Sequence, residues 1–534
     1  MGFRVNSAGR VNQGHFSRVP ANVAAPRSSF DRSFSHKTTV NEGYLYPILW
    51  EPVLPGDTVN LTMNALARLA TPIFPYMDNL YMDVHFFFVP NRLLWEHWEQ
   101  FQGAQDNPDD TTDYEVPALS AVTHAAGFGE LSIYDYFGLP TKIAGIEQAN
   151  MPIALPLRAY YKIWNDWYRD ENLQDSLVFP VTDAADTTAY ALQKRNRRKD
   201  YFTSALPWPQ KGDSVVLPLG TTAPVVGNNS GTVTQVRGLT SSETAQIQWT
   251  SAQGLTAGNA SGPFSESENI TFSGTTSLEA DLSDATAATV NELREAIVLQ
   301  QMLELDARGG TRYVEILLAR FGVVSPDFRL QRSEYLGGQT LDVNVNPIAQ
   351  SSETTAETPQ GNLAAFAVAR GKAAVNHSFV EHGQLLGLVS FRADTTYQQG
   401  LSRHWSVRTR YDYYEPLAAN LGEQAVLRKE IYMDGVDAND NTVFGYQERW
   451  AEYRYKPSYV TGLFRSNATA SLDSWHLAIE LSSAPTLETL IPEAPPVERI
   501  VAVTTEPHFI LDTWTRFRHV RVLPVYSAPG LTRL

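Results

Sequence analysis

Residues 44–66 read YLYPILWEPVLPGDTVNLTMNAL, and this stretch decides the fold class. Two short runs rich in β-forming residues flank PGD at 55–57, a sequence of turn-forming residue types. In the second run Val59, Leu61 and Met63 alternate with other residues, which is the period of a strand with one buried face. The stretch therefore predicts two strands joined by a tight turn.

Further runs of the same kind lie near both ends of the chain. They are LYMDVHFFFVP at 80–90, WHLAIELS at 475–482, PHFILDTW at 507–514 and TRFRHVRVLPVY at 515–526. Each is short and rich in β-formers, and long connections separate the first group from the second. This arrangement predicts a mainly β protein, a sandwich or jelly roll whose loops have grown into subdomains.

Two segments have the periodicity of helices. Residues 155–173 place large apolar side chains on one stripe at helical spacing: Leu157, Tyr160, Tyr161, Trp164, Trp167 and Tyr168. A buried packing face explains this stripe better than a cofactor or sugar site. A second helix is expected from Val290 to Arg308, ended by Gly309 and Gly310.

The composition is that of a globular protein. The 534 residues are 43% hydrophobic and 19% charged, with 42 basic and 58 acidic side chains and a net charge of −16. Cysteine is absent, which excludes disulfides and thiolate metal sites. The first thirty residues have no continuous apolar core and no run is long enough to span a membrane, so we expect a chain without signal peptide that is soluble where it is made.

Positive charge is concentrated in two places. Residues 1–40 form a basic arm, small-residue-rich and weakly patterned, in which Asp31 is the single acid against Arg4, Arg10, Arg18, Arg27, Arg32 and Lys37. Residues 194–199 hold five cations in six positions: Lys194, Arg195, Arg197, Arg198 and Lys199. Either stretch could neutralise phosphate, and the second could instead pair with acids across a subunit boundary.

Residues 213–290 differ in composition from the rest of the chain. They are dominated by Ser, Thr, Gly and Ala, with seven acids against one base, Arg237. Short alternations survive at 245–249 and 270–272, so a small, exposed, β-rich insertion is preferred over a flexible linker.

Two segments interleave arginine with tyrosine, and their residues are Arg408, Arg410, Tyr411, Tyr413, Tyr414, Tyr453 and Tyr455. These residue types are enriched at protein–protein interfaces, and they also stack on single-stranded nucleic acid. An interface between subunits is the favoured interpretation, followed by nucleic-acid contact and then by ordinary core packing.

The sequence gives little support for catalysis or metal binding. His377, Glu381 and His382 miss the spacing of a helical zinc site by one residue. A calcium-loop spacing occurs with Thr442 where the loop needs glycine, and its candidate ligands are Asp437, Asn439, Asn441 and Glu448. No phosphate loop or nucleophile elbow is present. We therefore expect no metal, no cofactor and no enzymatic activity.

Six long segments together resemble the major capsid protein of microviruses, the small single-stranded DNA phages, and most closely the gokushovirus branch. They are NRLLWEHWEQFQG, WNDWYRDENLQ, RKDYFTSALPWPQKG, DARGGTRYVEILLARFGVVSPDFRLQRSEYLGG, RADTTYQQGLSRHW and AEYRYKPSYVTG. The resemblance extends from about Ser33 to Tyr526, nearly the whole chain.

The resemblance implies an eight-stranded antiparallel jelly roll with large inter-strand insertions that contain a few helices. Residues 1–40 would be an interior arm, 41–212 and 291–534 the two parts of the jelly roll, and 213–290 a surface protrusion. Copies of the chain would form a T=1 icosahedral shell around circular single-stranded DNA. In that reading the arm cations and residues 194–199 face DNA, and the arginine–tyrosine segments join subunits.

The same resemblance implies further partners. Minor proteins would share the virion, and a host surface receptor would meet the protrusion at Trp249, Phe264, Glu266 and Glu268. Assembly would take place in the cytoplasm of a bacterial host, without membrane insertion. The alternative is a β-sandwich protein that binds or cleaves glycans, which would be a monomer or small oligomer with a carboxylate pair in a cleft.

Overall fold

The computed structural model describes residues 26–213, 215, 290–349, 351 and 363–526, together with the backbone of short strands between residues 225 and 280. The chain divides into two compact units. The first comprises Met1–Pro209 and Gly309–Leu534, and the second comprises Gln210–Arg308. Each unit is described by itself.

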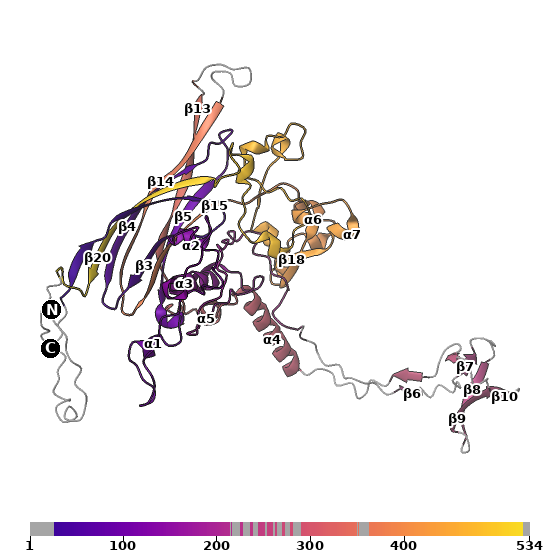
Figure 1. The fold of residues 1–534 in the computed structure, drawn as a ribbon. Helices are drawn as coiled ribbons and strands as arrows, with labels where there is room; N and C mark the ends of the chain where they lie inside the picture. Colours follow the sequence, from indigo (N-terminus) through magenta and orange to yellow (C-terminus); the bar gives the residue numbers. More distant parts are fainter. Residues whose placement is uncertain are drawn as a thin grey trace. The chain divides into compact units, whose positions relative to one another are not determined.

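The first unit is built on one curled antiparallel sheet (Figure 1). The strand order is β1-β20-β4-β14-β13-β5-β15-β3, and β2 also pairs with β20. The strands are β1 (Ser28–Asp31), β2 (Phe34–Val40), β3 (Tyr46–Val53), β4 (Thr58–Leu69), β5 (Leu80–Pro90), β13 (Glu334–Ala349), β14 (Leu363–Ser378), β15 (Gly383–Ala393) and β20 (Phe509–Arg521). The expected mainly β, antiparallel fold of jelly-roll type is thereby confirmed.

Strand β13 carries the sheet from one half to the other. Its residues 334–342 pair with β5, whereas residues 343–349 pair with β14. The two halves share one core, where Phe391 of β15 stacks on Phe509 of β20 with ring centroids 3.9 Å apart. Both rings are fully buried, so this contact joins strands that lie far apart in the strand order.

The predicted turn joins β3 to β4 as expected. Gly56 has φ +86°, a left-handed conformation that favours glycine. Asp57 closes the turn, because its carboxylate accepts a 2.9 Å hydrogen bond from the backbone N–H of Leu54. After the turn Val59, Leu61 and Met63 are all buried, as their alternation predicted.

The C-terminal strands differ from the expectation in two ways. The runs at 507–514 and 515–526 form one continuous strand, β20, and β1 and β2 lie end to end along it, which makes nine strands in the sheet rather than eight. The prediction of a strand at 475–482 is wrong. Its N–H groups make single bonds to different partners: Leu477 N–H donates to the Asp78 side chain at 2.8 Å, Leu481 N–H to the Gln399 side chain at 2.7 Å and Ile479 N–H to the backbone carbonyl of Thr396 at 2.9 Å.

The long helix-like segment covers the β5–β15 part of the sheet. It forms α3 (Leu155–Ile163) followed by a π-helical turn at Trp164–Tyr168. Four of its six stripe residues are buried and the other two are partly buried, so the packing role is confirmed. Because α3 contacts both strands, β15 is buried along its whole length, which explains why its sequence does not alternate.

Short elements complete the first unit. The remaining strands are β16 (Thr396–Tyr397), β17 (Glu423–Leu427), β18 (Val443–Glu448) and β19 (Ser458–Tyr459). The remaining helices are α1 (Trp98–Phe101), α2 (Ile133–Tyr136), α5 (Tyr313–Phe321), α6 (Arg428–Ile431), α7 (Asp437–Asp440) and α8 (Leu487–Leu490). A separate cluster of buried side chains forms beneath β17 and α6.

The second unit contains the predicted helix α4 (Val290–Arg308), which is confirmed with the predicted ends. A five-stranded sheet has the order β10-β9-β8-β7-β11, and β12 pairs with β6. The strands are β6 (Val225–Gly227), β7 (Gln235–Gly238), β8 (Thr244–Thr250), β9 (Gly254–Asn259), β10 (Gly262–Pro263), β11 (Ile270–Phe272) and β12 (Leu278–Ala280).

We predict that Phe391→Ala will destabilise the first unit strongly. It removes a fully buried ring stacked between the two halves of the sheet, and such a change costs about 3–5 kcal/mol of unfolding free energy. Ile510→Ala is the matched control, since Ile510 follows Phe509 on β20 but is 58% exposed. Urea denaturation of the unassembled chain measures the stability of both variants. Equal midpoints would contradict the claim that Phe391 joins the two halves of the sheet in one core.

Candidate subunit and nucleic-acid contacts

The basic stretch 194–199 belongs to the first unit and is partly buried there. Arg195 is buried, and its Nη1 donates to Asp83 Oδ2 at 2.6 Å and to Ser390 Oγ at 2.8 Å. The Nε of Arg392 donates to the same Asp83 oxygen at 2.8 Å. Thr340 donates to Oδ1 of Asp83 at 2.6 Å. One carboxylate on β5 therefore holds two buried guanidinium groups.

The charge balance of this site appears in the pKa of Asp83. Burial alone would raise it, but Arg195, the Thr340 hydroxyl and Arg392 outweigh burial and lower the pKa of Asp83 to about 2. The carboxylate therefore stays ionised at neutral pH inside the protein. Arg195 is thus bound to β5 and β15, and Thr340 of β13 bonds to the same carboxylate.

Arg197 also points inward. It is buried, and its backbone N–H donates to the carbonyl of Ile491 at 2.8 Å. Its charge lies near Glu493, whose pKa burial raises while Arg197 and then Arg195 oppose that shift. Two of the five cations of this stretch are therefore buried within the subunit.

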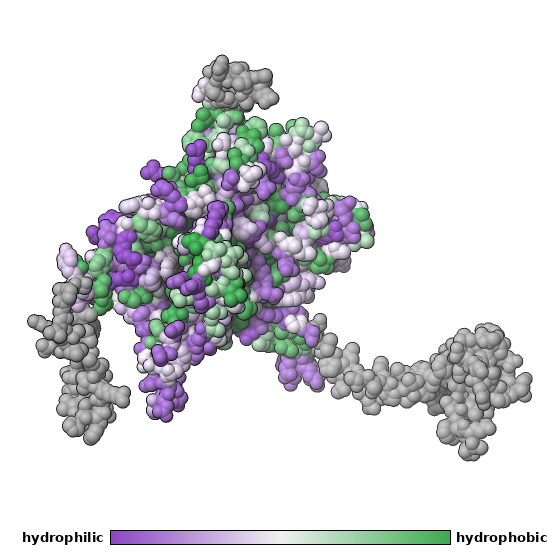
Figure 2. Space-filling view, viewed as in Figure 1, coloured by the Kyte–Doolittle hydropathy of each residue, from purple (hydrophilic) through white to green (hydrophobic). Residues whose placement is uncertain are grey.

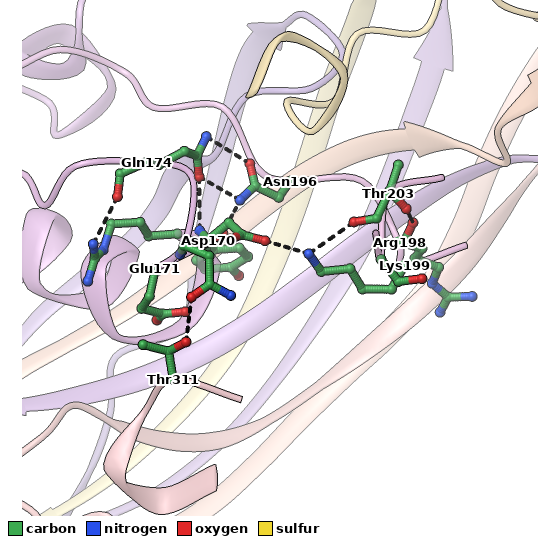
Figure 3. A network of polar contacts seen from close by, with 12 residues as sticks. Asp170, Glu171, Gln174, Asn196, Arg198, Lys199, Thr203 and Thr311 are labelled. Atoms are coloured by element: carbon green, nitrogen blue, oxygen red, sulfur yellow. Dashed lines mark hydrogen bonds and ion pairs between the residues drawn. The ribbon is translucent and has the colours of Figure 1, made fainter. Parts of the chain in front are cut away.

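The other members of the stretch lie nearer the surface. Lys194 packs over the Tyr44 ring at 5.2 Å. Lys199 forms an ion pair with Asp170 and donates to the carbonyl of Thr203 at 3.2 Å (Figure 3). Arg198 is exposed, and within the described part of the chain no carboxylate lies at ion-pair distance from it. Arg198 is therefore the member best placed to meet a partner.

The basic arm is described only in its last part. Arg4, Arg10 and Arg18 lie outside the described residues. Arg27 is exposed and donates to Thr58 Oγ1 at 3.2 Å, and Arg32 forms an ion pair with Glu51. The DNA-facing role of all these residues stays a prediction.

The arginine–tyrosine segments form an exposed aromatic surface. Tyr411 is 75% exposed, Tyr413 is 61% exposed, and Arg408, Arg410, Tyr414, Tyr453 and Tyr455 are exposed as well. Arg410 lies over the Tyr411 ring at 5.3 Å. The structure brings both segments together, because Tyr414 and Tyr453 have ring centroids 6.2 Å apart. We call these seven residues the aromatic surface.

A pocket of about 190 Å³ lies beside the aromatic surface, and Tyr453 belongs to both. Arg403 lines it and pairs with Glu430 at 3.1 Å and with Glu452 at 3.8 Å. Glu430 also accepts a 2.9 Å hydrogen bond from the Tyr201 hydroxyl. Burial raises the pKa of Glu430, against the opposing effect of a backbone N–H and Arg403. The pocket thus fixes the segments that carry the tyrosines.

The residues considered for metal binding are engaged elsewhere. Asp437 accepts from Asn441 Nδ2 at 2.7 Å, and Asn439 donates to Asp434 at 3.0 Å. Glu448 lies in β18 and pairs with Arg454. Glu381 pairs with Arg92 at 2.7 Å rather than with a histidine. Over the described ranges, no group of three or more His, Cys, Asp or Glu side chains is arranged to hold a metal.

The residues expected to contact the host belong to the second unit. Trp249 lies in strand β8. Phe264, Glu266 and Glu268 lie outside the described residues. Their role stays a prediction.

Comparison with known proteins decides the family. A family model described as capsid protein (F protein) of phages matches residues 17–531. The chain belongs to this capsid family. Three relatives named capsid protein VP1 agree over nearly their whole length: 46% identity with that of Bdellovibrio phage phiMH2K (98% of each chain), 44% with that of Chlamydia phage 1 (98% of each) and 37% with that of Spiroplasma virus 4 (95% of this chain and 96% of the relative).

Membership of this family confirms the prediction that the chain is a microvirus capsid protein of gokushovirus type. Because the family and its members are structural capsid proteins, the chain is a virion component and not an enzyme, and the glycan-cleaving alternative is not supported. Among the described helices, none has the length and apolarity required to cross a bilayer.

We predict that Asp83→Asn will destabilise the capsid protein and will make its stability depend less on pH in the acid range. Because the folded pKa of Asp83 lies below the ordinary 3.8, its ionisation stabilises the fold above that pH, and the stabilisation is lost as pH falls towards 2. The amide removes the paired carboxylate of the buried Arg195 and the nearer of two carboxylates at Arg392, whose Nη1 still lies 3.6 Å from Asp394. Breaking a buried ion pair of this kind costs about 3–5 kcal/mol at neutral pH.

Denaturation midpoints of the unassembled chain between pH 2 and 7 test this expectation. Asp512→Asn serves as control, because its 3.4 Å pair with Lys37 is exposed and contributes less than about 1 kcal/mol. A variant Asp83→Asn with the acid profile of the natural chain would contradict the role assigned to Asp83.

Proposed function

We propose that this capsid protein self-assembles into a T=1 icosahedral shell that encloses a circular single-stranded DNA genome. The observation that carries the proposal is membership of the phage capsid family over residues 17–531, together with a curled antiparallel sheet of jelly-roll type. Minor virion proteins complete the particle, and assembly takes place in the cytoplasm of the bacterial host.

Exposed apolar side chains support association between copies. Helix α5 has the sequence YVEILLARF, yet none of its residues is buried. Phe321 is 72% exposed and Val324, just after the helix, is 73% exposed. A helix of this composition is normally covered, so another subunit in the shell is its natural cover.

The aromatic surface is the second proposed subunit contact. Tyrosine and arginine are the residue types that concentrate binding energy at interfaces. The pocket beside it holds their segments in place, which lowers the entropy lost on association. Symmetric closure then multiplies modest contacts into a stable particle.

The insertion at 213–290 is proposed to contact a host receptor. Its acidic, small-residue composition and its short strands suit a protruding module, with Trp249, Phe264, Glu266 and Glu268 as the contact residues. DNA neutralisation is assigned to the arm cations and to Arg198 and Lys199 at the surface of the basic stretch, since Arg195 and Arg197 are buried.

Electron microscopy of the purified chain, combined with a nuclease-protection assay, tests the central proposal. We expect uniform closed particles that protect single-stranded DNA from added nuclease. Particles of another symmetry would contradict the T=1 assignment. A dispersed chain under all assembly conditions would contradict self-assembly.

We predict that Tyr411→Ala combined with Tyr413→Ala will lower the yield of closed particles at least about 10-fold, because truncating central interface tyrosines commonly costs more than 1 kcal/mol each. Both side chains are exposed, so the free energy of unfolding of the unassembled chain stays within about 0.5 kcal/mol of the natural value.

Sedimentation of assembly reactions measures the yield. Tyr526→Ala is the matched control, a tyrosine that is 87% exposed and lies outside the aromatic surface. Equal particle yields from the double variant and the control would remove the aromatic surface from the interface.

A further inference from the structure

One face of the main sheet carries an unusual set of side chains. Along β4, β20 and most of β14, buried side chains alternate with exposed or partly exposed ones, and the first residues of β2 alternate between partly buried and exposed. Six of the exposed positions are basic, namely Lys37, Arg68, Arg370, Lys372, Arg516 and Arg518. We call these six residues and Trp514 the basic sheet face.

The strand register brings these residues side by side. Trp514 lies opposite Asn64, which in turn lies opposite Lys372. Arg516 and Arg518 occupy successive outward positions of β20, about 7 Å apart. Asn60 lies opposite Arg518, so amide groups alternate with cations across the strands. The seven residues come from distant parts of the sequence and form one continuous surface.

The surface has an excess of positive charge in an acidic chain. On these four strands and β1, Asp512 and Asp31 are the outward acids, and Asp342 lies on the neighbouring strand β13. Lys37 pairs with Asp512 at 3.4 Å. The pKa of Asp31 is lowered by hydrogen bonds from Ser33 and, more weakly, by Arg518 and Arg516. The other basic side chains have no ion pair within the described residues.

The helices of the first unit leave this face open. Helices α2 and α3 contact β3, β5 and β15, at the other end of the strand order from β20 (Figure 1). Figure 2 shows hydrophilic patches mixed with apolar ones over the part of the sheet that contains β4 and β20, and the exposed Leu66 and Ile510 lie among the cations of this face. Trp514 is 52% exposed in the middle of it. The described part of the basic arm contains β1 and β2, and both strands pair with β20 beside the same face.

We propose that the basic sheet face binds single-stranded DNA. The arginines and lysines contact phosphates, and Trp514 offers a flat ring on which a base stacks. Cations beside an exposed aromatic ring are the combination that holds single strands without sequence preference. The inference rests on the proposed enclosure of DNA and deepens it, because it names a binding surface that lies apart from residues 194–199.

Salt dependence of binding to an oligo-dT strand, measured with the purified full-length chain by fluorescence anisotropy, tests the inference. Each phosphate contact on a single strand contributes about 0.7 to the slope of log affinity against log salt. Arg516→Gln combined with Arg518→Gln should therefore lower the slope by about 1.4. Trp514→Leu should weaken binding about 10-fold and leave the slope unchanged.

The matched control is Lys142→Gln combined with Arg329→Gln, which removes two exposed positive charges away from this face. The inference is overturned if the control and the β20 double variant change the slope equally, or if neither changes it. Should the β20 variant fail to fold, Arg370→Gln combined with Lys372→Gln tests the same slope from another strand.

Two outcomes separate this inference from the proposed function. If natural particles protect DNA while the β20 variant binds oligo-dT with an unchanged slope, the sheet face is not the DNA surface and the capsid proposal stands. If natural particles contain no protected DNA, enclosure itself fails. A variant that loses particle assembly but keeps its DNA affinity would identify the face as a contact between copies and overturn the inference.

Discussion

The first unit depends on one buried carboxylate that neutralises two buried arginines. Asp83 on β5 accepts from Arg195 and Arg392, and without it Arg195 would lose its ion pair while Arg392 would keep a longer one to Asp394 at 3.6 Å. Leaving a charge buried and unpaired is among the costliest defects a protein can carry. Because Arg392 belongs to β15 and Arg195 to the long connection before the second unit, this interaction fixes where that connection leaves the sheet.

This constraint changes the meaning of the most basic stretch in the sequence. A run of five cations suggests an exposed polyanion site, yet Arg195 pairs with Asp83 and Arg197 is buried near Glu493. On the basic sheet face, two pairs of exposed cations without an ion pair among the described residues, Arg370 with Lys372 and Arg516 with Arg518, are each separated by one small or apolar residue. On β20 the order Arg516, Phe517, Arg518 places both charges outside and the phenylalanine inside. In this protein, basic residues spaced along strands therefore indicate an exposed positive surface better than the cluster at 194–199 does.

The sequence predicts the strands well where alternation reports burial on one face, as at Val59, Leu61 and Met63. It predicts α3 and α4 because their apolar residues recur at helical spacing. The run at 475–482 has the right composition but forms no strand ladder, since N–H groups on either side of Ile479 bond to the distant side chains of Asp78 and Gln399. Pairing of that kind depends on tertiary structure and leaves no local pattern.

The candidate contacts likewise divide into those that a local sequence pattern predicts and those that only the tertiary structure reveals. Exposure of the aromatic surface could be anticipated, because tyrosines that alternate with charges do not suit a core. The pocket beside it could not, since Tyr201, Arg403 and Glu430 are far apart in sequence and meet only in the fold. The basic sheet face shows why register matters: Lys372 and Trp514 become near neighbours only when β4 lies between their strands. Local sequence thus specifies which side chains point outward, and strand order specifies which of them act together.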